Sequence, residues 1–389
     1  RREIPIHRSS GPPVFLGLIS GTSGDGIDAA MVQIDAISTR VIDANTFAYP
    51  PGLAKRLAAS LIAPYEQTVT TTGKLHHDLG VAFADAADAL RSAHPDVYVT
   101  AVASHGQTLF HAAGTASPFT LQVSDPTIIA ARTGLPVVAD FRSADVAVGG
   151  QGAPLAPLFH EAVLPYDEET LAVINLGGIA NLSLIRPGEP TIGFDTGPAN
   201  TLMDVWAARQ WDLPFDANGE IAASGTVIPG LLAHMLEDAY FARQFPKSTG
   251  REYFNIEWLL RALGAVGLET PSQQRDARRD IMATLSELTV STLASALADC
   301  ECVVDSVLIC GGGAHNAALL ARLEQVCTPA SVSTTADRGI DPDYVEAALF
   351  AWLGWKRWHQ QPIDSRAITG ATQRIVAGGI YLPPVGGSE

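Results

Sequence analysis

Two stretches of the chain each contain an apolar segment, a glycine-containing turn and a second apolar segment. The first covers residues 14–34 and turns at residues 21–28, and the second covers residues 171–185 and turns at Gly177-Gly178. Short apolar segments joined by a glycine turn are typical of two strands that pair across a tight connection. Because the same unit occurs twice, the sequence predicts two domains of related architecture.

The length of the chain also favours two domains. It has 389 residues, which exceeds the size at which a single hydrophobic core usually stops growing. We expect a loose tail over residues 1–13, an N-terminal domain over residues 14–140 and a C-terminal domain over residues 141–389, whose final helix can pack back on the first domain. Two domains that pack directly and hinge against each other are expected to leave a cleft between them.

Strands and helices alternate along the rest of the chain. A 3.6-residue apolar period predicts a helix over residues 75–92. Short apolar runs predict further strands at residues 97–103, 136–139, 192–194 and 306–310. This order is typical of the α/β class, here with mixed sheets flanked by helices.

Charge and cysteine content argue against several classes of protein. The formal net charge is -16, and no basic run offers the patch that nucleic acid or an anionic membrane requires. The cysteines, Cys300, Cys302, Cys310 and Cys327, lack the paired spacing of a disulfide framework or a zinc site. No apolar run reaches the roughly 18 to 20 residues of a membrane span, and the N-terminal segment lacks the apolar middle of a signal peptide. We therefore expect a cytoplasmic protein.

The first glycine turn has the residues of a phosphate-binding turn. It reads Gly21-Thr22-Ser23-Gly24-Asp25-Gly26-Ile27-Asp28, and such a turn can aim backbone N–H groups and hydroxyls at phosphate oxygens. It lacks the lysine of a Walker A loop, and no helix obviously follows it. Its two carboxylates would repel phosphate unless at least one of them, for instance Asp25, holds a hydrated Mg²⁺. A plain hairpin turn explains the same residues.

Two more glycine turns and one aspartate follow apolar strands. Gly177-Gly178 and Gly311-Gly312-Gly313 can let a nucleotide approach the backbone, although the first of them also fits a simple hairpin. Asp195 follows the strand predicted at residues 192–194 and precedes a helix that begins at about Thr201. General bases are common at such places in α/β enzymes. A turn or capping aspartate is the alternative.

Polar side chains on other strand ends and loops suit sugar hydroxyls and a carboxylate, although loop structure alone would explain most of them. They lie in His105-Gly106-Gln107, in Asp140-Phe141-Arg142 and in residues 149–154 around Gln151. The basic cluster at residues 247–251 can meet an anionic group of a ligand, and a solvated loop explains it equally well.

These blocks occur in the order seen in anhydro-N-acetylmuramic acid kinases, and the chain resembles that family from about Phe15 to Pro383. The matching blocks are residues 21–28, 104–108, 140–142, 149–154, 175–181, 195–200, 247–255 and 311–313. The resemblance implies two actin- and hexokinase-like domains, of the ribonuclease H-like type, with ATP and sugar in the interdomain cleft.

The resemblance also implies the reaction and the roles of single residues. The family uses ATP and Mg²⁺ to open 1,6-anhydro-N-acetylmuramic acid with water and to phosphorylate its O6, during peptidoglycan recycling. Asp195 would take a proton from the attacking water. The candidate sugar contacts are Gln107, Arg142, Gln151 and Glu346. A homodimer is implied as well.

The sequence departs from the family pattern at two places, and two other functions also fit its residues. Gly24 stands where the family usually has leucine, and Ser143-Ala144 stands where relatives often carry further arginines. A kinase for an ordinary hexose or amino sugar, without ring hydrolysis, fits the residues as an alternative. An ATP-binding switch or sensor without sugar turnover is the alternative from another class.

Overall fold

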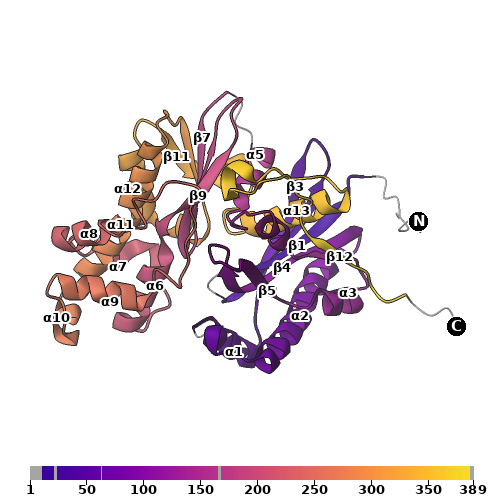
Figure 1. Ribbon diagram of the computed structural model, residues 1–389, viewed down its shortest axis with the longest axis horizontal. Helices are drawn as coiled ribbons and strands as arrows, with labels where there is room; N and C mark the ends of the chain where they lie inside the picture. The colour runs from indigo at the N-terminus through magenta and orange to yellow at the C-terminus, as the bar shows by residue number, and fades with distance from the viewer. Residues whose placement is uncertain (1–10, 22–23, 63, 165–167, 386–389) are drawn as a thin grey trace. The chain divides into compact units, whose positions relative to one another are not determined.

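The structure is a computed structural model that describes residues 11–21, 24–62, 64–164 and 168–385 (Figure 1). Contacts between residues divide the chain into two compact units. Unit 1 contains Arg1–Gly152, Tyr344–Ser365 and Ala371–Glu389, and unit 2 contains Ala153–Asp343 and Arg366–Gly370.

The first division between the units follows Gly152 rather than the expected Asp140. The reason is that Gly152 itself is hydrogen-bonded to Arg142 and Asp145 of unit 1. Residues 1–10 of the expected tail lie outside the described residues.

Unit 1 is built on a seven-stranded sheet in the order β12-β6-β4-β1-β2-β3, with β5 paired to β4. Its strands are β1 (Val14–Ser20), β2 (Gly26–Ile34), β3 (Thr39–Ala48), β4 (Val99–Ala112), β5 (Phe119–Val123), β6 (Val137–Ala139) and β12 (Gly379–Tyr381). Strands β1, β2 and β3 are antiparallel neighbours, whereas β4 runs parallel to β1 and β6 parallel to β4. The first hairpin predicted from the sequence is therefore confirmed.

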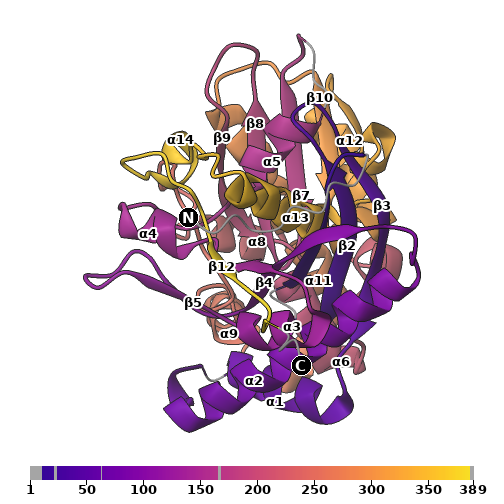
Figure 2. The same cartoon turned by 90° about the vertical axis from the view of Figure 1, so that its right-hand side faces the viewer.

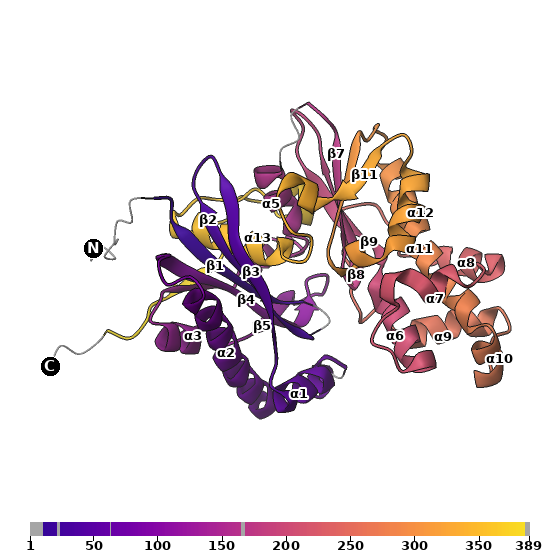
Figure 3. The same cartoon turned by 180° about the vertical axis from the view of Figure 1, so that it is seen from behind.

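The two faces of β1 pack on different helices. Leu16 and Leu18 belong to the apolar core that includes α2 (Val69–Ser92), whereas Phe15 and Gly17 contact α13 (Val345–Trp358). Alternate residues of a strand point to opposite faces of the sheet, so burial on both faces explains the continuous apolar sequence of β1. Helices α1 (Pro51–Ile62) and α3 (Pro126–Thr133) lie with α2, as Figures 2 and 3 show.

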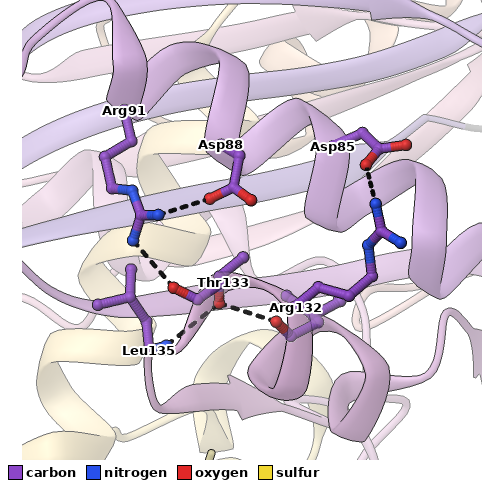
Figure 4. Close-up of polar contacts among 7 residues, drawn as sticks. Asp85, Asp88, Arg91, Arg132, Thr133 and Leu135 are labelled. Carbon is purple, nitrogen blue, oxygen red and sulfur yellow. Dashed lines mark hydrogen bonds and ion pairs between the residues drawn. The ribbon is translucent and has the colours of Figure 1, made fainter.

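Polar contacts at the surface fix α3 to α2 (Figure 4). Arg91 donates to the carbonyl of Thr133 at 3.0 Å and pairs with Asp88 at 2.8 Å. Arg132 pairs with Asp85 at 2.6 Å. Exposed ion pairs of this kind contribute about 0–1 kcal/mol each, so they add little to the stability of this packing. Strand β6 follows α3 and is positioned by it.

Unit 2 contains a five-stranded sheet in the order β11-β10-β7-β8-β9. Its strands are β7 (Leu171–Leu176), β8 (Ile179–Ile185), β9 (Ile192–Pro198), β10 (Ser306–Cys310) and β11 (Ser331–Thr334). Strands β7, β8 and β9 are antiparallel, and β10 and β11 run parallel to β7. Unit 1 has the same order and directions in β6, β4, β1, β2 and β3. The predicted α/β class with mixed sheets flanked by helices is confirmed.

Helices cover both faces of this second sheet. One face packs on α11 (Arg278–Asp299) and α12 (Ala317–Cys327), and the other packs on α5 (Ala156–Val163). Beyond α11 lies a group of helices that have a core of their own (Figures 1 and 3). They are α6 (Asn200–Trp211), α7 (Glu220–Ala223), α8 (Pro229–Leu236), α9 (Ile256–Ala265) and α10 (Pro271–Asp276).

Helix α11 is long and apolar enough to span a membrane by length and composition, which the sequence analysis did not expect. Its most apolar window is 61% buried inside the structure. It packs against α6, α7, α8, α12 and strand β9. These contacts are those of a core helix.

Helix α5 buries a histidine against the sheet of unit 2. His160 is fully buried, and its Nδ1 lies 2.8 Å from Ser183 Oγ. Its Nε2 is buried and has no partner among the described residues. Burial lowers the pKa of His160 to about 3. The imidazole is therefore neutral in the folded protein at neutral and mildly acidic pH.

We expect His160 to make stability depend on pH. The unfolded chain binds a proton there below the usual pKa of 6.5, and the folded chain binds it only near 3, so stability falls as the pH falls through this window. Between pH 7 and pH 5 the loss from this group is about 2 kcal/mol. The double variant His160→Leu/Ser183→Ala removes both polar partners, and its free energy of unfolding, measured in urea, is expected to fall less over this range. Parallel pH profiles for the two proteins would contradict this account.

Candidate functional site

The first glycine turn connects β1 to β2 in unit 1. Thr22 and Ser23 lie outside the described residues. Gly24 N–H donates to the carbonyl of Gly21 at 3.1 Å, and the φ of Gly24 is +63°, a left-handed value that favours glycine. A Cβ on Gly24 would lie 2.6 Å from Leu61 Cδ1. Glycine at this position therefore suits both the left-handed backbone of the turn and the limited space beside Leu61.

Gln107 lies directly beside this turn. It belongs to β4, which pairs with β1, and it is almost fully buried. Its Nε2 donates to the carbonyl of Gly21 at 3.1 Å, and its Oε1 is buried without a partner among the described residues. The structure thus shows the amide nitrogen of this candidate sugar contact supporting the turn.

The carboxylates of the turn differ in their surroundings. Asp28 lies within β2, and its Oδ1 accepts a hydrogen bond from Thr46 Oγ1 at 2.6 Å. Asp25 is exposed, and Ile27 between the two is buried in the core. Burial of Ile27 fixes the register of β2, so the two carboxylates have defined positions at the end of the hairpin.

Arg142 is held by acceptors from two segments of unit 1. Its Nε donates to His105 Nε2 at 2.8 Å, and its NH1 donates to the carbonyl of Gly152 at 2.7 Å. The guanidinium lies 5.9 Å from the ring centroid of Phe350, a residue of α13. These contacts define the position of a candidate binding group for an anion.

The loop that carries Gln151 is closed by a buried carboxylate. Asp145 is fully buried, and it accepts from the N–H of Gly152 at 2.7 Å and from the hydroxyl of Ser365. Gly149 and Gly152 have φ values of +86° and +69°, which glycine adopts without strain. Gln151 therefore sits on a loop with a fixed backbone.

Glu346 lies in the first turn of α13 in the same unit. Burial raises the pKa of its carboxyl, the charge of Asp28 raises it further, and the charge of Arg142 opposes both effects. The structure thus brings Asp28, Arg142 and Glu346 within electrostatic range of one another, although they lie far apart in the sequence.

In unit 2 the start of α6 is hydrogen-bonded to the second glycine turn. The carbonyl of Gly178 accepts from the N–H groups of Ala199 and Thr201 at 3.0 and 3.1 Å, and the carbonyl of Gly177 accepts from Asn200 N–H at 3.0 Å. Asn200 Nδ2 also donates to the carbonyl of Leu176 at 2.9 Å. The motif at residues 195–200 is therefore folded onto the turn between β7 and β8.

The third glycine turn reaches the same end of β7. A Cβ on Gly311 would lie 2.2 Å from Asn175 Oδ1, and one on Gly313 would lie 2.5 Å from Leu176 Cβ. Gly311 also has a φ of +77°, whereas a Cβ on Gly312 would meet nothing within 4 Å. Close packing against β7 thus requires glycine at the first and third positions.

Asp195 is fixed through its main chain and its side chain. Its N–H donates to the carbonyl of Lys247 at 3.1 Å, and its carbonyl accepts from Tyr240 Oη at 2.7 Å. Its Oδ2 accepts from the N–H of Thr249 at 3.0 Å. The side chain is largely buried. A carboxylate held in this way is preorganised to accept a proton from a correctly placed donor.

The prediction that Asp195 follows a strand was wrong in detail. Strand β9 ends at Pro198, because Asp195 pairs with Asn181 of β8 and Gly197 pairs with Ala180. Residues 195–198 read Asp-Thr-Gly-Pro and have no alternating apolar pattern, so their pairing could not be seen in the sequence.

The loop at residues 247–251 has a role that the sequence did not indicate. The Lys247 ammonium lies 5.8 Å from the ring centroid of Phe194 and 5.2 Å from that of Tyr240. Burial lowers the pKa of Lys247. This loop supports Asp195 through the backbone of Lys247 and Thr249, and backbone contacts of this kind leave no signature in residue type.

The chain is similar over nearly its whole length to anhydro-N-acetylmuramic acid kinases. The model of the family described as anhydro-N-acetylmuramic acid kinase matches residues 13–383. The enzyme of that name from Xanthomonas campestris pv. campestris (strain 8004) is 43% identical over 382 residues, which cover 97% of this chain and 99% of the relative. The enzyme from Pasteurella multocida is 40% identical over 371 residues, with 94% and 96% covered.

The match includes every block singled out above, from the first glycine turn to the third. A further relative, from Vibrio cholerae, is 40% identical over 373 residues, which cover 95% of this chain and 98% of the relative. The chain therefore belongs to the anhydro-N-acetylmuramic acid kinase family.

Proposed function

We propose that this protein uses ATP to phosphorylate O6 of 1,6-anhydro-N-acetylmuramic acid while it opens the anhydro ring with water. The products are N-acetylmuramic acid 6-phosphate and ADP, and the reaction serves the recycling of peptidoglycan. Family membership supports the sugar and ATP as substrates. The observation that carries the hydrolytic step is that hydrogen bonds with Lys247, Tyr240 and Thr249 hold Asp195 in place.

Asp195 acts as the general base in this proposal. Its carboxylate takes a proton from a water molecule whose oxygen forms a bond to C1 of the sugar, and the bond between C1 and O6 breaks. O6 then bonds to the γ-phosphorus of ATP as the bond from that phosphorus to ADP breaks. Thr249 N–H holds Oδ2 of the carboxylate, so the base needs no reorientation during proton transfer.

In this proposal the glycine turns supply backbone groups for ATP. In the first turn Asp25 is exposed, while Asp28 is partly engaged by Thr46. Mg²⁺ commonly takes one or two carboxylates together with water and phosphate oxygens, so the exposed Asp25 would hold such an ion through water. The ion would neutralise charge on the phosphates. The described residues contain no group of three histidine, cysteine, aspartate or glutamate side chains that could hold a metal together.

The chemical test is the mass of the product. The protein is incubated with ATP, Mg²⁺ and the anhydro sugar in water enriched in ¹⁸O. The product is expected to gain one water and one phosphoryl group, with the heavy oxygen on C1. A phosphorylated product that lacks the added water would contradict ring hydrolysis.

A kinase for an ordinary amino sugar makes a different prediction. It would phosphorylate N-acetylmuramic acid, in which the ring is already open, at least as well as the anhydro form. Comparison of kcat/KM for the two sugars separates the two functions. Equal turnover of both would remove the hydrolytic role of Asp195.

Replacement of Asp25 tests the proposed phosphate turn. Asp25→Ala is expected to raise the KM for Mg·ATP about tenfold or more and to leave the KM for sugar nearly unchanged, because one charge-assisted contact is lost. Asp96→Ala, which removes another exposed carboxylate of unit 1, serves as the matched control. A fall in sugar affinity with unchanged ATP affinity would show that the turn is misassigned.

We also propose a cytoplasmic location and a homodimer. ATP is supplied in the cytoplasm, and the described cysteines are all free thiols, as expected in a reducing compartment. Light scattering of the purified protein at several concentrations tests the dimer.

A further inference from the structure

The hydrogen bond between Arg142 and His105 lies in unit 1, and no step of the reaction yet uses it. We propose that His105 is a positioning residue, which orients the Arg142 guanidinium to bind the lactyl carboxylate of the sugar. This inference rests on the proposed function, because it requires Arg142 to contact that substrate.

The contacts of His105 fix the state of its ring. Nδ1 lies 3.0 Å from the carbonyl of Gly106, and a carbonyl can only accept, so Nδ1 carries the hydrogen. Nε2 is then the acceptor for Arg142 Nε–H at 2.8 Å. The ring is buried and lies 4.3 Å from the Phe350 ring, centroid to centroid. The imidazole is thus locked as a neutral acceptor of one tautomer.

Electrostatics agree with this arrangement. Burial lowers the pKa of His105 well below its usual value, and the neighbouring Arg142 charge lowers it further. His111 and Glu346 also face this charge: burial lowers the pKa of His111 to about 4, with Arg142 contributing, while burial raises that of Glu346. A neutral His105 therefore persists at physiological pH, and its acceptor nitrogen stays available to Arg142.

The acceptors of these two hydrogen bonds, His105 Nε2 and the Gly152 carbonyl, are uncharged. These bonds therefore orient the planar guanidinium through neutral groups. Asp145 in turn fixes Gly152, because its carboxylate accepts a hydrogen bond from the Gly152 N–H. An arginine with a fixed plane can bind a carboxylate through two parallel hydrogen bonds, and binding weakens when the plane is free to rotate.

The carboxylate of the lactyl group distinguishes the muramic acid from the corresponding glucosamine. A group that positions Arg142 should therefore raise the preference of the protein for 1,6-anhydro-N-acetylmuramic acid over 1,6-anhydro-N-acetylglucosamine, which lacks that carboxylate. Loss of orientation is expected to appear mainly in KM or in binding, since the contact is distant from the bonds that change.

The experiment compares three variants on both sugars. His105→Phe keeps an aromatic ring against Phe350 but offers no acceptor, and it is expected to lower kcat/KM for the acidic sugar about tenfold, mainly through KM. For the neutral sugar it is expected to change kcat/KM less than about twofold. His105→Gln, whose Oε1 can accept from Arg142, should recover much of the loss. Arg142→Gln should reduce the preference for the acidic sugar at least as much as His105→Phe does.

Binding of the products N-acetylmuramic acid 6-phosphate and N-acetylglucosamine 6-phosphate, measured by calorimetry, gives the same comparison if the neutral sugar is turned over too slowly. Melting curves check that each variant is folded, and His77→Gln, at an exposed position of α2, is the control. Equal losses on both sugars in His105→Phe would overturn the inference. If Arg142→Gln leaves the preference for the acidic sugar unchanged, the inference also fails, and so does the sugar contact proposed for Arg142. The tests of Asp195 and of the product mass do not depend on this result.

Discussion

Asp195→Asn is expected to lower kcat for the anhydro sugar by about 10² to 10⁴-fold, the usual contribution of a positioned general base. Asparagine has the shape of aspartate, and its Oδ1 can still accept from Thr249 N–H, where the carboxylate oxygen lies at 3.0 Å. The hydrogen bonds that the Asp195 main chain makes with Lys247 and Tyr240 do not involve the Asp195 side chain. The variant should therefore be folded, and it should lack only the capacity to take a proton.

Steady-state kinetics and nucleotide binding together test this prediction. The affinity for ADP, measured by calorimetry, is expected to stay within about twofold of the wild-type value, because the base acts on the sugar. Asp212→Asn is the matched control: Asp212 is an exposed residue of unit 2 with a φ of +57°, which asparagine tolerates. Wild-type turnover in Asp195→Asn would remove this residue from the mechanism, and a parallel loss of ADP binding would indicate a structural role instead.

Local patterns predicted several elements and the position of the glycine turns, but not β3, β5 or the full length of β4, which runs to Ala112. The apolar run at residues 306–310 is β10, and the helix predicted over residues 75–92 is the greater part of α2. The helix begins earlier, at Val69, because Thr68 and Thr71 form a capping box. The three threonines that follow Val69 have no apolar period, so the first turn of α2 could not be recognised from periodicity.

Contacts between distant residues could not be predicted in the same way. The position of Asp195 depends on Tyr240, Lys247 and Thr249, and two of these contribute only backbone atoms. The sequence singled out Gln107 and Arg142 by residue type, but it could not show that Gly21 and His105 are their partners. Such partners depend on strand register and loop closure, which are set by the whole fold.

The close packing of α13 on the sheet of unit 1 requires glycine at two positions. A Cβ on Gly17 of β1 would lie 1.8 Å from the carbonyl oxygen of Ala347 and 2.7 Å from the nitrogen of Ala351. Both atoms belong to the backbone of α13, so no side-chain rotation can relieve the overlap. Gly354 on the same helix approaches Ala103 of β4 in a similar way, since a Cβ there would lie 2.6 Å from the Ala103 Cβ. Small residues on both sides thus allow close contact of helix and sheet.

We expect Gly17→Ala to destabilise the protein by about 3 kcal/mol or more, because α13 must move off the sheet. Gly73→Ala is the control: Gly73 lies in α2, a Cβ there meets nothing within 4 Å, and alanine should raise helix stability by up to about 1 kcal/mol. Urea denaturation of the three proteins gives both free energies. A Gly17→Ala protein as stable as the wild type would show that α13 is held loosely. Because Glu346 lies in the first turn of α13, the same displacement should also weaken sugar binding in whatever fraction of Gly17→Ala remains folded, if Glu346 contacts the sugar as proposed.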